Sequence, residues 1–281
     1  MIFLAVKREE RYSPNRSISD KAMMDAACSA LKEQDDMIFK MQEYEFGSEG
    51  VDDPGTFDAV LHMCRSEKAL VQLDAIEKSG VTVVNRPAAV RNCRRSNEVR
   101  LLSGTDANFV VSRVVSGGEF PDDWNSFPCW LKRGDTHAID SDDVCFAATR
   151  DEASAIMKNI SAKGSGEVVL QEHVPGKIVK FYGVGDGRMF HYRFLETVAD
   201  GKFGLEIHNE IGQTGINEEL FRTEVVRIAG ILGVDAYGGD AIVTPEGKIV
   251  IVDFNDWPSF FDCRAEAAKS IAELIREKCA K

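Results

Sequence analysis

The first third of the chain alternates short apolar runs with longer amphipathic segments, and this alternation restricts the folds that are open to it. Strands are predicted for the apolar runs at 2–6, 37–46, 57–64 and 81–85. Helices are predicted at 19–34, 66–80 and 86–102, with Ser19 or Asp20 as the cap of the first and Gly80 as the end of the second. Strands that alternate with helices in this way indicate a parallel sheet, and therefore an α/β domain.

The composition changes after residue 104, where small, polar and turn-forming residues surround a single predicted strand at 109–115. Further strands are predicted at 129–134, 144–148, 167–174, 177–185, 188–196, 238–244 and 248–254, and further helices at 150–164, 217–233 and 263–278. The short turn at 245–247 is expected to join the last two strands as a hairpin. We therefore predict an N-terminal α/β domain at 1–104, a linker with a small domain at 105–174, and a C-terminal mixed-sheet domain at 175–281.

The composition also narrows the functional classes. Of the 281 residues, 44% are hydrophobic and 28% are charged, which is typical of a soluble globular protein. The formal net charge of -12 argues against nucleic acid or an anionic membrane as the main partner. No apolar run approaches the roughly 20 residues that cross a bilayer, and the opening segment lacks the pattern of a secretory signal. The seven cysteines include no Cys-x-x-Cys pair, which favours reduced thiols and a cytoplasmic location.

The segment IVIVDFNDWPSF, residues 249–260, places a cluster of polar side chains at the end of a buried strand. Asp253 and Asn255 are two residues apart, so they point to the same face of the strand. The hairpin turn allows Asp240, on the preceding strand, to lie opposite Asp253. A few carboxylates, completed by water and substrate phosphates, suit Mg²⁺. The alternative is a set of polar residues that only caps a strand end, but donors at matched positions on both strands favour the metal site.

The stretch GGDAIVTPEGKIVIVDFNDWP, residues 238–258, resembles the metal-binding hairpin of the ATP-grasp superfamily. The resemblance implies that Asp240, Asp253 and Asn255 ligate Mg²⁺, or Mn²⁺ in its place. It also implies the ATP-grasp fold, an α/β (α+β) architecture with an N-terminal parallel α/β domain, a small central lid domain and a C-terminal mixed-sheet domain. The acid on the second strand is usually Glu in the ligase branches, which include the ribosomal-protein glutamate ligases. Asp253, with the Asn and aromatic-Pro that follow, is more similar to the inositol-phosphate kinase branch.

The same resemblance implies a nucleotide site. Lys132, at the end of the strand CWLKR, matches the lysine that reaches the α- and β-phosphates, and Lys180 matches the basic residue on the strand after the hinge. The hinge corresponds to VVLQEHVPGK, which implies that adenine and ribose contact Gln171, Glu172, His173 and Val174. Many ligases have an Asp two positions before that basic residue, whereas this chain has Ile178. Without the resemblance, Lys132 reads as a surface lysine, and the hinge reads as a strand followed by a Pro-Gly turn.

Further positions are each open to two readings. The loop 134–143 occupies the place of a glycine-rich phosphate loop, where His137 either contacts phosphate or substrate or only closes a surface loop. Arg193 matches an arginine that faces the transferred phosphoryl group, or it is an exposed strand cation. In the basic helix, Arg94 is the preferred match to a phosphate-binding residue and Arg95 is the alternative, whereas a run of charges by itself predicts a solvated face.

The resemblance implies transfer of the terminal phosphoryl group of ATP, with Lys180, Arg193 and His137 as the groups around it, but a fold does not determine the acceptor. One hypothesis is a ligase that joins a carboxylate to an amine through an acylphosphate. A second is a kinase that phosphorylates a hydroxyl of a small molecule. A third is a nucleotide-binding module without activity, which the complete metal-ligand set argues against. The acceptor is expected to be a small molecule, with walls formed by Asp256, Trp257 and Ser259 together with residues of the N-terminal domain. A homodimer is expected only by analogy with the fold.

Overall fold

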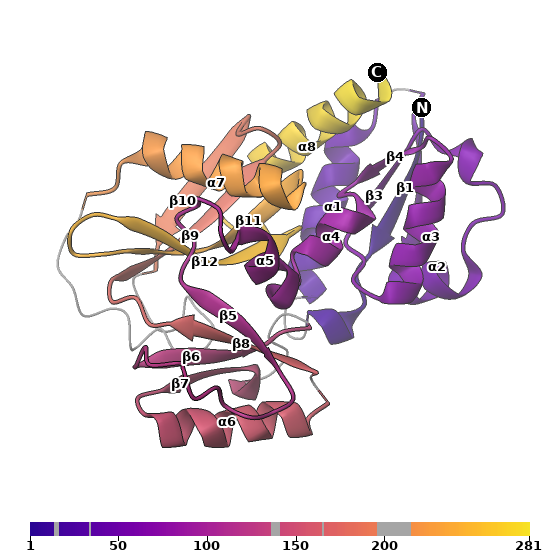
Figure 1. Cartoon of the computed structure of the whole chain (residues 1–281). Coiled ribbons are helices and arrows are strands. Elements are labelled where there is room, and N and C mark those ends of the chain that lie inside the picture. The colour runs from indigo at the N-terminus through magenta and orange to yellow at the C-terminus, as the bar shows by residue number, and fades with distance from the viewer. Residues whose placement is uncertain (14–16, 34, 136–140, 165, 196–214) are drawn as a thin grey trace.

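The computed structural model describes residues 1–13, 17–33, 35–135, 141–164, 166–195 and 215–281. Their strands form three sheets, which Figure 1 shows as an N-terminal, a C-terminal and a central unit. The predicted α/β class is confirmed, because the N-terminal sheet is parallel and helices alternate with its strands. The structure has no described helix that is both long enough and apolar enough to span a membrane.

The N-terminal sheet has the strand order β2-β1-β3-β4. Its elements are β1 (Ile2–Lys7), α1 (Ser17–Leu31), β2 (Met37–Gln42), α2 (Glu43–Glu49), β3 (Ala59–His62), α3 (Glu67–Lys78), β4 (Thr82–Val84), α4 (Pro87–Asn92) and α5 (Arg95–Leu102). Alternate side chains of β1 face opposite sides of the sheet, so that Phe3 and Ala5 pack against α1 while Leu4 and Val6 pack against α2 and α3. Helices therefore cover both faces, as is usual for a parallel sheet.

Several boundaries in this domain differ from the prediction. Helix α1 begins at Ser17, so neither Ser19 nor Asp20 caps it, and Asp20 is buried against Arg8. The predicted strand at 37–46 ends at Gln42, because a capping box formed with Glu45 starts α2 there. The predicted helix at 86–102 is broken into α4 and α5 by the extended backbone at 94. Packing of α4 in the C-terminal core outweighs the helical propensity at this point.

The central sheet has the order β5-β8-β6-β7 and is antiparallel. It contains β5 (Ser112–Ser116), β6 (Cys129–Arg133), β7 (Val144–Ala147) and β8 (Glu167–Glu172), with α6 (Arg150–Ala162) against one face. Leu131, Leu170 and Met157 of α6 belong to a core that is separate from the cores of the other two sheets. Trp130 and Lys132 alternate with Leu131 on β6, so they point to the other face.

The C-terminal sheet has the order β10-β9-β11-β12. It contains β9 (Lys177–Val184), β10 (Met189–Phe194), β11 (Ala236–Val243) and β12 (Ile249–Asp256), with α7 (Glu218–Leu232) against one face. These strands pair antiparallel, and among the described residues the parallel pairing expected of a mixed sheet occurs here as an isolated bridge between Phe109 and Ile251. The predicted hairpin is confirmed as β11 and β12. As a consequence, β12 is an edge strand, and its outer side faces the rest of the molecule.

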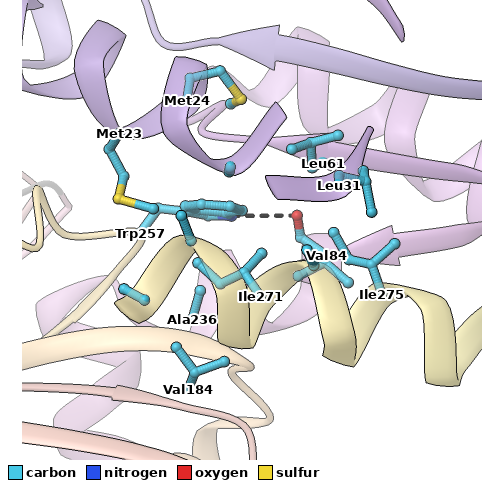
Figure 2. Close-up of a cluster of buried hydrophobic side chains, with 14 of the residues drawn as sticks. Met23, Met24, Leu31, Leu61, Val84, Val184, Ala236, Trp257, Ile271 and Ile275 are labelled. Carbon is cyan, nitrogen blue, oxygen red and sulfur yellow. Dashed lines mark hydrogen bonds between the residues drawn. The ribbon is translucent and has the colours of Figure 1, made fainter. Parts of the chain in front are cut away.

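The last helix, α8 (Arg264–Cys279), joins the N-terminal and C-terminal units into one core. It packs against α1, β4 and β9 (Figure 1). Trp257 follows β12 and is fully buried in this shared core, near Met23 of α1 and Ile271 of α8 (Figure 2). Its indole Nε1 donates a hydrogen bond of 3.2 Å to the carbonyl oxygen of Val84, at the end of β4. The end of the hairpin is therefore attached to the N-terminal sheet.

Candidate functional site

A row of charged side chains crosses the C-terminal sheet at one level. Arg193 of β10 pairs in register with Lys180 of β9, Lys180 pairs with Asp240 of β11, and Asp240 pairs with Asp253 of β12. Residues that pair directly across a sheet point to the same face, so the row presents two cations and then two carboxylates. The predicted position of Asp240 opposite Asp253 is confirmed. Asn255 lies two residues beyond Asp253, and therefore on the same face. We call these four paired residues, without Asn255, the charged row.

The charged row separates an apolar level of this face from a polar one. On one side lies a small apolar cluster of Val174, Ile178, Leu195, Ile242 and Val252. On the other side, the next residues in register are His191, Tyr182, Gly238 and Asn255. The rings of Tyr182 and His191 stack with their centroids 6.3 Å apart. The face therefore changes from apolar to charged to polar along the strands, which suits a ligand with an apolar end and a charged middle.

A β-bulge in the hairpin provides a contact between the central sheet and the strand that carries Asp253. The register shifts between Asp240 and Ala241, so that Val252 has no partner residue on β11. The carbonyl oxygen of Val252 accepts hydrogen bonds from Lys132 Nζ at 3.1 Å and from Gln171 Nε2 at 3.2 Å. Both donors come from the central sheet and are nearly buried. Two residues predicted for the nucleotide site thus meet the hairpin one position before Asp253.

Each carboxylate of the charged row has a hydrogen-bond partner on the same face of the sheet. Lys180 Nζ lies 2.7 Å from Asp240 Oδ1, and Asn255 Nδ2 donates to Asp253 Oδ2 at 3.0 Å. Burial lowers the pKa of Lys180, but the Asp240 carboxylate outweighs this effect and leaves the pKa raised. Lys180 is therefore a cation throughout the physiological range.

Lys132 differs from Lys180 in that its pKa is lowered rather than raised. Burial lowers the pKa of its ammonium to about 8, although the nearby Asp253 carboxylate acts in the opposite direction. Glu98 of α5 is 1% exposed, and burial together with Asp253 raises the pKa of its carboxyl well above the usual value. A buried ammonium whose neighbouring carboxyl favours the neutral form gains most from an anionic ligand such as phosphate.

The two arginines at the start of α5 point in different directions. Arg94, the preferred match, binds Glu67 of the N-terminal domain at 2.7 Å. Arg95, the alternative, is 6% exposed, and its Nε lies 3.6 Å from Asp253 Oδ1. The structure therefore brings Arg95 rather than Arg94 to the charged row, because the break between α4 and α5 turns the two side chains apart. Their roles in ligand binding stay predictions.

The predicted hinge residues span the end of β8, with Gln171 and Glu172 as its last two residues and His173 and Val174 directly after it. Glu172 accepts a hydrogen bond from the Ser126 hydroxyl. His173 belongs to an aromatic group, in which Trp130 Nε1 donates to His173 Nδ1 at 3.2 Å and the rings of Phe146 and His173 have centroids 5.4 Å apart. Burial lowers the pKa of His173, so the ring favours its neutral form. This aromatic group offers flat apolar surface, and Val174, the residue after His173, belongs to the apolar cluster of the C-terminal sheet.

Some predicted site residues are not part of this arrangement. His137 lies outside the described residues. Asp256 and Trp257, predicted as walls of the acceptor site, are 1% and 0% exposed. That prediction is wrong for both, because their side chains are buried against the N-terminal domain. Ser259 is only partly buried.

The oxygen donors of the hairpin fit Mg²⁺. Asp240 and Asp253 supply carboxylates from directly paired positions, and Asn255 supplies an amide beside them. In the part of the chain that the structure describes, no group of three or more His, Cys, Asp and Glu side chains is arranged to hold a metal ion. A site with two carboxylates needs substrate oxygens or water to complete its coordination, which is the preference of Mg²⁺ rather than of a structural zinc.

Comparison with known proteins identifies the fold. No family model matches the sequence, and no curated protein matches it. The D-alanine–D-alanine ligase of Bacillus anthracis, complexed with ATP, is similar over 100% of this chain and 97% of its own, with a TM-score of 0.70 and 11% identity. A RimK domain protein ATP-grasp of Sphaerobacter thermophilus is similar over 98% and 99%, with a TM-score of 0.64 and 18% identity. The ATP-grasp ligase PsnB, complexed with minimal precursor, Mg and ADP, is similar over 99% and 98%, with a TM-score of 0.61 and 15% identity. The chain therefore has the ATP-grasp fold, as its sequence predicted.

Several residues around the charged row and at the end of β12 were not predicted from the sequence. Asp262 forms an ion pair of 2.6 Å with Arg193. Glu98 lies three residues after Arg95 on α5, and that helical spacing was a usable signal that both side chains share a face. Arg8 and Arg65 bind Asp256 from the N-terminal domain, and they carry no local signal because their partner is far away in the sequence.

Proposed function

We propose that this chain is an ATP-dependent ligase that joins a carboxylate to an amine through an acylphosphate. The observation that carries the proposal is the charged row, with Lys132 approaching it from the central sheet. Two cations and two carboxylates on one face suit a triphosphate with its divalent cation. The fold supports the proposal, since similar structures include a ligase complexed with ATP and a ligase complexed with Mg and ADP.

The nucleotide would lie between the central and C-terminal sheets. The apolar cluster of the C-terminal sheet and the ring of Trp130 would contact adenine, with Gln171, Glu172, His173 and Val174 forming the hinge beside it. Lys132 and Lys180 would hold the phosphates as point charges in a site of low dielectric constant. The unit at 105–174 would act as the lid that excludes water, and its separate core suits such a movement.

The hairpin would hold the cation. Asp240, Asp253 and Asn255 are the residues for Mg²⁺, with Mn²⁺ as a substitute, and bound metal neutralises charge on phosphate oxygens. Asp240 and Asp253 face each other across the hairpin, so small changes in the strand pairing would alter the distance between their oxygens. The rigidity of the hairpin is therefore part of the site.

The proposed reaction has two displacement steps. A carboxylate oxygen of the acceptor attacks the γ-phosphorus of ATP, a new P–O bond forms, and the bond from the γ-phosphorus to the β–γ bridging oxygen breaks to release ADP. An amine then attacks the acyl carbon, the C–N bond forms, phosphate leaves, and the amine nitrogen loses a proton. The chain supplies orientation and positive charge, in which Lys180 and Arg193 balance the oxygens of the transferred group.

An ADP-release assay with panels of acceptors tests the proposal. Carboxylate–amine pairs are compared with polyols and inositol phosphates, and hydroxylamine is added to trap an acylphosphate as its hydroxamate. The ligase proposal expects ADP release that needs the carboxylate, together with a hydroxamate. Asp253→Ala should abolish this turnover, whereas Asp123→Ala, on an exposed residue of the central unit, should leave it unchanged. Turnover that survives Asp253→Ala would refute the metal assignment.

One observation favours a second function, a kinase that acts on a hydroxyl. The second strand of the hairpin carries Asp253, whereas the ligase branches of the resembling family usually carry Glu. A kinase would release ADP with polyols or inositol phosphates and would form no hydroxamate. Nucleotide binding without turnover on either panel would instead identify a binding module that has no activity.

A further inference from the structure

The end of β12 is held by two arginines of the N-terminal domain. Arg65 Nη2 lies 2.9 Å from Asp256 Oδ1, and Arg8 Nη2 lies 3.5 Å from Asp256 Oδ2. Asp256 is 1% exposed, and the side chains of Arg8 and Arg65 are 5% and 12% exposed. Arg8 also contacts Asp20 of α1 at 3.5 Å. Both oxygens of one buried carboxylate are thus bound by guanidinium groups that follow β1 and β3.

The backbone at this point depends on the same arginines. Among the strands that the structure describes, none pairs with the outer side of β12 as a ladder, and further along this side Ile251 exchanges hydrogen bonds with Asn108 and Val110. At its end, the carbonyl oxygens of Asp256 and Trp257 accept from Arg65 and Arg8 at 3.5 Å each. Trp257 then leaves the strand direction with a φ of 37°. On the inner side, Asp256 is still paired with Tyr237, and the Trp257 amide donates to the carbonyl oxygen of Ala236 at 3.0 Å. The arginines therefore hold the outer side of the strand end, where β11 cannot reach.

We call Asp256 with its two arginines, Arg65 and Arg8, the anchor. The anchor adjoins Asn255, a predicted metal ligand. Asp256 and Asn255 are consecutive in an extended strand, so their side chains point to opposite faces. Asn255 points to the face of the charged row, where its Nδ2 donates to Asp253 Oδ2. A shift or rotation of the backbone at Asp256 therefore turns Asn255 by the same movement and changes its contact with Asp253.

We propose that Arg65, assisted by Arg8, is a positioning residue of the metal site. Arg65 acts through Asp256, and it thereby sets the direction in which the side chains of Asn255 and Asp253 point. This inference rests on the proposed function only for the identity of the metal ligands. Arg65 and Arg8 are not among the proposed ligands of the metal or the nucleotide; they bind Asp256, whose side chain points to the opposite face from Asn255. They fix the strand that carries the ligands, so their loss lowers the affinity for the cation. Partners that orient metal ligands from outside typically contribute about 10- to 100-fold in metal affinity, and we expect a loss of that size for Arg65→Met.

Electron paramagnetic resonance of free Mn²⁺, in titrations of the whole chain with ADP present, measures this affinity directly. Arg65→Met removes the charge at similar length. Arg65→Lys restores the charge without the planar guanidinium, whose Nη2 donates to both a carboxylate oxygen and the carbonyl oxygen of Asp256. We expect the full loss for Arg65→Met and a smaller loss for Arg65→Lys. Asp256→Asn should also lower the Mn²⁺ affinity, because it weakens the same anchor from the other side. If Arg65→Met does not fold, Arg65→Lys and Asp256→Asn make the same comparison with smaller perturbations.

Arg276→Met is the matched control. Arg276 of α8 also joins two units, through Asp36, but it lies away from the hairpin end and outside the binding machinery. It should lower the stability of the fold while leaving the Mn²⁺ affinity unchanged. Circular dichroism at the titration temperature verifies that each variant is folded.

The outcomes separate the two proposals. An Arg65→Met protein that binds Mn²⁺ as tightly as the native chain refutes the positioning role. So does an equal loss of Mn²⁺ affinity in Arg276→Met, because the effect would then be one of general stability. If Asp253→Asn binds Mn²⁺ with ADP as well as the native chain does, the metal assignment itself is wrong. If the native chain binds no Mn²⁺ with ADP, both proposals fail.

Discussion

Because the imidazole of His62 is buried, we predict that acid lowers the free energy of unfolding within a defined pH window. His62 ends β3 and is fully buried, and its Nε2 donates to the carbonyl oxygen of Asn85 at 2.7 Å while its Nδ1 accepts from the Cys64 amide at 3.1 Å. Burial lowers its pKa from 6.5 to about 4, although the Asn85 carbonyl raises it. A proton on Nδ1 would also face the N–H of Cys64, which disfavours the charged ring further.

The pKa values of His62 in the unfolded and folded states determine the sign and the size of the change in the free energy of unfolding. As the pH falls below 6.5, the unfolded chain binds a proton at this position and the native chain does not, so the free energy of unfolding decreases. The loss caused by His62 is about 2 kcal/mol at pH 5 and about 3 kcal/mol at pH 4, and it is close to zero above pH 7. Below the folded-state pKa of about 4 the loss no longer grows, because both states are then protonated.

Urea unfolding of the native chain and of His62→Gln, measured from about pH 7.5 to about pH 5, tests this prediction. Glutamine keeps a donor towards Asn85 but does not titrate. The difference in unfolding free energy between the two proteins should therefore change by about 2 kcal/mol over this range. His191→Gln is the control, because it removes a histidine that is only partly buried. A difference for His62→Gln that is independent of pH would refute the reasoning.

Substitutions at four further positions test contacts within the C-terminal unit and between it and the N-terminal domain. Trp257→Ala should lower the free energy of unfolding by about 3–5 kcal/mol, and Trp257→Phe by less, because Phe keeps most of the apolar surface but leaves the Val84 carbonyl without its donor. Asn85→Ala should cost about 3 kcal/mol or more in urea unfolding, since its amide binds three backbone groups of Asp235 and Ala236. Asn92→Ala, which removes one such bond, should cost about 1 kcal/mol. In Gly239→Ala the new Cβ would lie 2.1 Å from the Asp253 carbonyl oxygen, so both thermal stability and Mn²⁺ binding should fall, and unchanged Mn²⁺ binding would contradict the need for close strand pairing.

Much of the site could be predicted from the sequence because its signals are local. The two-residue period places Asp253 and Asn255 on one face, and the short turn brings Asp240 across from Asp253, as the structure confirms. The same periodicity places Trp130 and Lys132 on the face of β6 opposite its core. In contrast, the choice between Arg94 and Arg95 depends on where α4 ends, and that end is decided by packing against the C-terminal core.

The sequence by itself determined the parallel α/β start, the hairpin and the pairing of Asp240 with Asp253, because hydrophobic period and turn chemistry act between near neighbours in the chain. Only the tertiary structure decided which side chains complete the site. The bulge that offers the Val252 carbonyl to Lys132 and Gln171, and the ion pairs from Arg8 and Arg65 to Asp256, join segments that are far apart in sequence. Such contacts depend on how the three sheets are arranged relative to one another, and no local pattern in the sequence encodes that arrangement.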